Sequence, residues 1–374
     1  MTEPSVDEWH LVSDLHLGTE GSERQSAAFV RFLDALRDGC ETGHTDLVLL
    51  GDVFELYPEN SDGINLASLR SSLSRLHANL TNHPDVLEAL ASVLRSGIGV
   101  RVVPGNHDLD FHRFEVQDAL REALRVAGAG SAADITFHPW IYSVPGVLHA
   151  EHGHRYHDIN AVPVNPVLPS NELFLPAATR AVHDERPFAL AVLAAIRNEG
   201  RPWFRRRPLL WPPETTKLAS SMSVDPIAVQ RLDRLASPTI LSTVARLLRS
   251  AMQGSRHAGE YLERSAPNIS AAFRSLNPRP VVHAFGHTHR ATIRGLSTGA
   301  VYANCGTWTE HYPRPHPEPT DRRYTWLRVR RHTSTAQVAV LEWLDDRSVN
   351  RTISALEVPL RGSSPRGIRI PGAS

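Results

Sequence analysis

Five short segments of the chain combine aspartate, asparagine and histidine in patterns that can bind divalent metals. They are Asp14-Leu15-His16, Gly51-Asp52, Gly105-Asn106-His107-Asp108, His152-Gly153-His154 and Gly286-His287-Thr288-His289. Carboxylate, amide and imidazole groups together form the mixed oxygen and nitrogen donor set that transition metals accept. Two adjacent divalent metals can activate water and neutralise a phosphoryl group. The residue types therefore indicate metal-dependent hydrolysis of a phosphate ester.

The spacing within these segments suits shared metal sites. Asp14 and His16 are two residues apart, so their side chains would share one face of a continuing strand. His287 and His289 repeat this spacing. The two carboxylate oxygens of Asp52 suit a position between two metals. One Asp-x-His or Gly-Asp pair is common in ordinary turns, but five such segments in one chain predict a single site.

Two of the segments add neutral donors and leave one alternative open. The amide oxygen of Asn106 suits a hard cation, and His107 follows it directly. His152 places an imidazole after another apolar run, and His154 lies two residues later. From spacing alone, either of these last two histidines could be the ligand.

Each segment follows a short apolar run that is typical of a buried strand. The runs are 9–12, 46–50, 100–103, 147–150 and 281–285. Apolar residues recur at three- and four-residue steps over 66–80 and 86–94, which predicts amphipathic helices. Strands that alternate with helices indicate an α/β layered fold. Ligands of such folds collect beyond the carboxyl ends of the strands, where all five segments lie.

The alternation is interrupted between the fourth and fifth segments. Residues 162–278 begin with several prolines and continue as broken helical patterns, which predicts a mostly helical insertion or cap of 117 residues. The core would then consist of residues 1–161 and 279–361. Alternating patterns after residue 323 predict two more strands. The Gly-, Pro- and Ser-rich tail 362–374 is expected to be flexible.

Composition argues against several classes of partner. The 374 residues carry 40 basic and 40 acidic side chains, and this zero net charge does not favour general attraction to nucleic acid. Two cysteines do not form a disulfide framework. Residues 1–8 lack a signal-peptide pattern, and the longest apolar run, 188–196, is far shorter than the roughly 20 residues that span a bilayer. We therefore expect a cytoplasmic protein.

Taken together, the motifs resemble those of the calcineurin-like metallophosphoesterase family over residues 9–158 and 279–310. The resemblance implies a four-layer α/β/β/α sandwich with two divalent metal ions, which could be Mn, Fe, Zn, Co or Ni. It also favours His152 over His154 as the ligand. The implied ligands are Asp14, His16 and His289 for one metal, Asn106, His152 and His287 for the other, and Asp52 between them.

The resemblance also implies roles beyond metal binding. His107 would be the catalytic histidine, and Asp108 would orient it through a hydrogen bond. Water activated by the metals would attack in line, and His107 would protonate or stabilise the leaving oxygen. Arg155 and His154 are candidate substrate contacts, with a surface salt bridge as the alternative for Arg155.

The substrate is less well defined by the sequence. Residues 11–18 and 51–56 are similar to the UDP-diacylglucosamine hydrolase branch, which cleaves a pyrophosphate in a lipid precursor. The chain departs from that branch by its Gly-Asn-His-Asp motif, where those enzymes have Arg after Asn, and by its longer insertion. Aromatic residues alternate with arginines over 201–211, a pattern that peripheral membrane contact or an amphiphilic substrate would use. The interpretation that we favour for these residues is a cap docked on the core with solvated arginines.

Three classes of function fit these observations. The first is a hydrolase of a phosphomonoester, phosphodiester or pyrophosphate in a phosphorylated small-molecule or amphiphilic substrate. The second is a nuclease of the same fold, which the neutral charge disfavours. The third is a non-catalytic scaffold, which should have lost metal ligands, whereas every expected position is filled. We therefore expect a metal-dependent phosphoric ester hydrolase.

Overall fold

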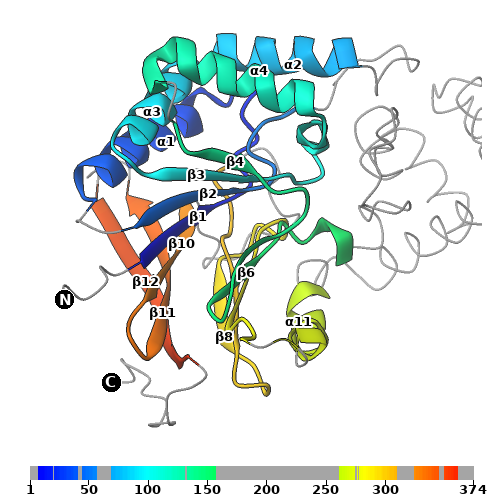
Figure 1. The fold of residues 1–374 in the computed structure, drawn as a ribbon, viewed down its shortest axis with the longest axis vertical. Helices are drawn as coiled ribbons and strands as arrows, with labels where there is room; N and C mark the ends of the chain where they lie inside the picture. Colours follow the sequence, from blue (N-terminus) through cyan, green and yellow to red (C-terminus); the bar gives the residue numbers. More distant parts are fainter. Residues whose placement is uncertain are drawn as a thin grey trace, which may run out of the picture.

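Two β-sheets packed against each other form the centre of the protein (Figure 1). The structure is a computed structural model. It describes residues 7–19, 21–40, 44–56, 69–130, 133–156, 261–273, 276, 278–309, 324–344 and 349–360. The predictions for a helical cap over most of 162–278, for membrane contact at 201–211 and for a flexible tail at 362–374 lie outside these ranges. Within them, no helix has both the length and the apolar character that crossing a membrane requires.

The seven-stranded sheet carries the strands that lead to the first three motifs. Its order is β12 (Val349–Pro359), β11 (Thr335–Leu344), β10 (Thr325–Arg331), β1 (Asp7–Val12), β2 (Thr45–Leu50), β3 (Gly99–Val103) and β4 (Ile135–Phe137). Strands β1 to β4 run parallel, whereas β10 to β12 add antiparallel neighbours. Every residue of β2 and β3 is buried, as expected for parallel strands covered on both faces.

The five-stranded sheet leads to the last two motifs. Its order is β5 (Tyr142–Val144), β6 (Leu148–Ala150), β7 (Val282–Phe285), β9 (Val301–Asn304) and β8 (Thr292–Gly295). Strands β6, β7 and β9 are parallel, and the two edge strands are antiparallel to them. Apolar side chains of β6, β7 and β9 meet those of β1, β2 and β10 in one buried core between the sheets.

Helices cover the outer face of each sheet (Figure 1). The seven-stranded sheet is covered by α1 (Glu23–Asp38), α2 (Leu69–Asn82), α3 (Pro84–Arg95) and α4 (Phe114–Leu124). The five-stranded sheet is covered by α11 (Tyr261–Ala272), whose Leu262 and Ile269 pack with Phe285 and Tyr302. The result is the predicted four-layer α/β/β/α sandwich.

Most of the predicted elements are present, and four strands of the structure were not predicted. The predicted helices of 66–80 and 86–94 correspond to α2 and α3. Strands β4, β5, β8 and β12 carried no clear signal, because β4 and β5 have three residues each and β8 and β12 are largely exposed edges. Helix α11 falls within residues 162–278, yet it packs on the core sheet. The domain boundaries themselves stay a prediction.

Candidate metal centre

The five motifs lie just beyond the carboxyl ends of β1, β2, β3, β6 and β7, and backbone hydrogen bonds tie them together. The backbone N–H groups of Asp14 and His16 donate to the carbonyl oxygens of Gly51 and Asp52, at 3.1 and 2.9 Å. The N–H of Gly286 donates to the carbonyl of His152 at 2.9 Å. The motifs of both sheets therefore converge on one edge of the sandwich.

An unusual backbone conformation marks the same loops. Six non-glycine residues in the described ranges have a positive φ, and five of them are predicted metal ligands. These five are Asp14, His16, Asp52, His287 and His289, with φ between 49° and 67°. A left-handed backbone is costly for residues with a side chain, and such residues cluster at functional sites. The conformation recurs in the loops that follow β1, β2 and β7.

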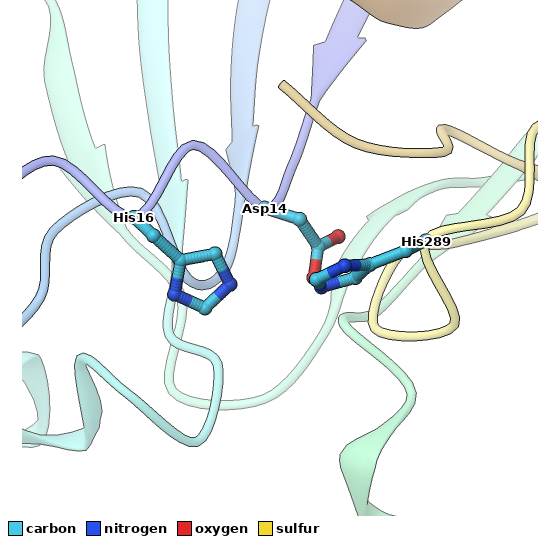
Figure 2. A group of neighbouring side chains, drawn as sticks. All are labelled: Asp14, His16 and His289. Atoms are coloured by element: carbon cyan, nitrogen blue, oxygen red, sulfur yellow. The ribbon is translucent and has the colours of Figure 1, made fainter. Parts of the chain in front are cut away.

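One group of candidate ligands joins the first and last motifs. Figure 2 shows Asp14 and His16 on the loop after β1, with His289 approaching from the loop after β7. One ligand atom of each lies within 4.8 Å of the others. The Oδ1 atom of Asp14 lies 3.1 Å from Nε2 of His289, while its Oδ2 accepts from Ser13 Oγ at 2.5 Å and from the N–H of His287 at 2.9 Å. These bonds leave one carboxylate oxygen of Asp14 directed at the histidine.

A second group lies beside the first. It contains Asp52, His152 and His287, again with ligand atoms within 4.8 Å of one another. The Oδ2 atom of Asp52 lies 3.1 Å from Nε2 of His152 and 3.9 Å from Nε2 of His16, so Asp52 stands between the two groups. The Nδ1 atom of His152 lies 2.9 Å from the carbonyl oxygen of Leu50, which orients Nε2 toward Asp52.

The donor set fits divalent cations. The Oδ1 atom of Asn106 is buried and accepts no hydrogen bond from the described residues. A buried amide oxygen without a donor fits a metal ligand. Burial raises the pKa of Asp52, but the charges of His152 and His107 outweigh it and hold that pKa well below the usual value. Burial likewise lowers the pKa of His152, but Asp52 and Asp14 raise it to about 9. The buried carboxylates therefore attract positive charge, which bound metals would supply.

Glu55 is a site residue that the sequence reasoning did not single out. Its side chain is 3% exposed, with Oε1 3.0 Å from Nδ1 of His107 and Oε2 3.2 Å from Nδ1 of His16. Burial opposes protonation of His107, but the charges of Glu55 and Asp52 raise its pKa to about 10. Burial raises the pKa of Glu55, but the charges and hydrogen bonds of His107 and His16 lower it to about 2. The signal available was an acidic residue three positions after Asp52.

His107 contacts the candidate ligand His16 and is partly exposed. Its imidazole is 11% exposed and stands edge-on to that of His16, with ring centroids 4.6 Å apart. Its backbone N–H donates to Oδ1 of Asp52 at 2.8 Å. Because Nδ1 faces Glu55, the Nε2 edge is the one directed away from that carboxylate. His107 thus combines contact with the candidate ligands and access from outside.

The predicted hydrogen bond from Asp108 to His107 is wrong. The carboxylate of Asp108 accepts backbone N–H groups instead, from Gly105 at 2.6 Å, Val53 at 2.9 Å and Asp52 at 3.2 Å. Glu55 orients His107 in its place. Burial and the charge of Asp52 raise the pKa of Asp108 to about 7. Asp108 therefore joins the second and third loops. Without its carboxylate these buried N–H groups would lack an acceptor, which costs free energy.

His154 and Arg155, the candidate substrate contacts, follow His152 in the chain. The ring of His154 is buried and lies 5.5 Å from that of His152, and the group of candidate ligands contains His152, not His154. Burial and the charge of His152 hold the pKa of His154 well below its usual value. The guanidinium of Arg155 lies over the ring of Trp140, at 5.2 Å from its centroid.

Helix α2 supports the loops from outside. The buried Asn79 donates from Nδ2 to the carbonyl oxygens of Leu17 and Glu55, at 2.5 and 3.3 Å. Arg75 pairs at 3.2 Å with the buried Asp110, which follows the third motif. One helix thus contacts three of the converging loops, since Leu17, Glu55 and Asp110 come from different ones.

Comparisons with known proteins agree with this geometry at the level of family. The family model for calcineurin-like phosphoesterases matches residues 10–291. No curated protein matches the chain. A dimetal phosphatase from Danio rerio is 13% identical, covering 96% of this chain and 100% of that chain with a TM-score of 0.38. Vacuolar protein sorting 29 from Cryptosporidium parvum is 10% identical, covering 95% and 98%, with a TM-score of 0.36.

A Vps29 single mutant from Entamoeba histolytica is 13% identical, covering 94% of this chain and 98% of that chain with a TM-score of 0.31. These structural likenesses are weak, whereas the family model spans most of the chain. Because this family model covers residues 10–291 and so most of the chain, the protein belongs to the calcineurin-like phosphoesterase family.

Proposed function

We propose that the protein hydrolyses a phosphomonoester, phosphodiester or pyrophosphate bond with two divalent metals. The observation that carries this proposal is the position of Asp52 between two groups of histidine and carboxylate ligand atoms. The ligands proposed for the first metal are Asp14, His16 and His289. Those for the second are Asn106, His152 and His287, with Asp52 shared. When bound, such a pair supplies an activated water and neutralises the charge of the phosphoryl group.

The chain's own residues contribute orientation and a proton. The Glu55 carboxylate accepts from Nδ1 of His107, so the imidazolium would present its Nε2–H away from Glu55. We assign this proton to the leaving oxygen, which otherwise departs as an alkoxide. The reaction then consumes one water. A phosphomonoester yields an alcohol and phosphate, a phosphodiester yields an alcohol and a phosphomonoester, and a pyrophosphate yields two phosphates or phosphomonoesters. No serine or cysteine nucleophile is required.

A metal-reconstitution experiment tests this proposal. The protein is stripped with a chelator, reloaded separately with Mn, Fe, Zn, Co or Ni, and assayed with bis(p-nitrophenyl) phosphate and p-nitrophenyl phosphate. Activity should vanish on stripping and return with at least one metal at about two ions per chain. Asp52→Asn should bind fewer ions, whereas Asp118→Asn, on the exposed face of α4, is the control. Full loading without turnover on any phosphate ester would overturn the proposal.

The alternatives predict different results. A nuclease of this fold would bind DNA with an affinity that falls steeply with salt, and the zero net charge argues against such binding. A non-catalytic scaffold would turn over no ester under any metal loading. The narrower similarity to the UDP-diacylglucosamine hydrolase branch, the amphiphilic substrate and the membrane contact through 201–211 stay predictions. Liposome flotation without binding, together with unchanged activity after deletion of 201–211, would remove the last two.

A further inference from the structure

Arg155 lies three residues after the candidate ligand His152 and contacts a buried carboxylate and an aromatic ring. It lies in the 3₁₀ turn η3 (His154–Tyr156), which begins two residues after His152. Its Nη1 lies 3.7 Å from Oε2 of Glu151, and its guanidinium stands 5.2 Å from the ring centroid of Trp140. The side chain is 34% exposed. A buried carboxylate and an aromatic face thus hold a charged group at the surface.

Glu151 braces the turn that carries Arg155. The Oε1 atom of this buried residue accepts from the Tyr156 hydroxyl at 2.6 Å and lies 2.9 Å from Nε2 of His149. The backbone N–H of Tyr156 also donates to the carbonyl of Gly153 at 3.2 Å. In contrast, the 3.7 Å separation from Arg155 is too long for a hydrogen bond, and Oε2 accepts none from the described residues. Among the described residues, the guanidinium of Arg155 therefore has an ion-pair partner in Glu151 and no hydrogen-bond acceptor.

The rings of Trp140 and His154 connect Arg155 to the candidate ligand His152. The ring of His154 lies 5.9 Å from that of Trp140 on one side and 5.5 Å from that of His152 on the other. Both of its nitrogens are buried without a hydrogen-bond partner among the described residues. An anion on Arg155 would therefore be a group distinct from a phosphoryl group at the candidate ligands, with His154 between the two.

We propose that Arg155 binds a second anionic group of the substrate, next to the scissile phosphate, and that His154 faces the atoms between the two. This inference rests on the proposed function. A planar guanidinium that is oriented in advance offers paired donors to a phosphate or a carboxylate. Preferred substrates would then carry a further phosphate or carboxylate near the ester, whereas a singly charged diester would use only the metal-binding residues.

The test compares Arg155→Ala with Arg155→Lys on three substrates. They are bis(p-nitrophenyl) phosphate, a nucleoside diphosphate with a second phosphate, and phosphoglycolate with a carboxylate. Arg155→Ala should lower kcat/KM roughly 10- to 100-fold on at least one of the last two, mainly through KM, and leave the first unchanged. Arg155→Lys should lower kcat/KM less than Arg155→Ala does. Which substrate responds identifies the second anion as phosphate or carboxylate.

A binding measurement keeps the inference separate from the proposed function. Measured by calorimetry, Arg155→Ala should weaken the binding of inorganic pyrophosphate and leave the binding of inorganic phosphate unchanged. Arg294→Ala is the matched control, because Arg294 pairs with Glu263 at 3.5 Å and is 62% exposed on β8. Equal losses of affinity for pyrophosphate and phosphate, or no loss of affinity for either, would overturn the role of Arg155. Absence of turnover in the unmodified protein would count against the proposed function alone, since the binding comparison would still decide the role of Arg155.

Discussion

The Oε1 atom of Glu55 lies 3.0 Å from Nδ1 of His107, and both side chains sit at the junction of the second and third motif loops. The same carboxylate reaches Nδ1 of His16 through its other oxygen. One buried acid therefore sets the orientation of a candidate metal ligand and of the candidate proton donor. This coupling makes Glu55 the most informative position to change.

Glu55→Gln should lower kcat about 10- to 100-fold and weaken metal binding, because both imidazoles lose a charged acceptor. Steady-state kinetics and elemental analysis after dialysis would measure the two effects. Glu342→Gln is the control, since Glu342 on β11 pairs with the half-exposed Arg351 on β12. Unchanged kcat and metal content would show that Glu55 only packs.

The metal-free protein should lose stability between about pH 6.5 and pH 10 through His107. Its pKa is raised to about 10 in the folded state from an ordinary value of 6.5. The folded state thus binds this proton more tightly, so the stabilisation is complete below pH 6.5 and disappears as pH rises through 10. Urea unfolding at pH 6.5, 8 and 10 would measure it. His107→Gln should show a flatter slope than the unmodified chain, and identical slopes would contradict the assignment.

His152→Ala and His154→Ala should differ in metal content. His152 belongs to a group of converging ligand atoms and His154 does not, so only His152→Ala should lose about one ion per chain. His154→Ala should keep both ions. Elemental analysis of the two reloaded variants, each checked for folding by circular dichroism, would distinguish them. The reverse result would make His154 the ligand.

Asp108→Asn should destabilise the protein by about 1–3 kcal/mol, because the amide Nδ2 cannot accept a backbone N–H. Its carboxylate oxygens accept from Gly105, Val53 and Asp52. Urea unfolding of the metal-free variant would measure the loss. Asp118→Asn in an exposed pair with Arg121 should stay within about 0.5 kcal/mol. A loss of activity at unchanged stability would restore a direct catalytic role for Asp108.

The sequence by itself determined the chemistry of the donors and the strands that carry them. Apolar runs ending at Asp14, Asp52, Asn106, His152 and His287 predicted both, because strand burial and metal binding each demand particular residue types locally. The helices of 69–82 and 84–95 were recognisable for the same local reason. These features depend on neighbours in the chain.

Only the tertiary structure decided the contacts between loops. Glu55 lies three positions after the candidate ligand Asp52, and Asp108 lies two positions after Asn106. Glu55 faces histidines, whereas Asp108 faces backbone N–H groups. Their directions follow from how the second and third loops pack, and from left-handed backbone at residues such as Asp52. Sequence spacing specifies which residues are near along the chain, whereas the partner of a buried acid depends on which segments the two sheets bring together.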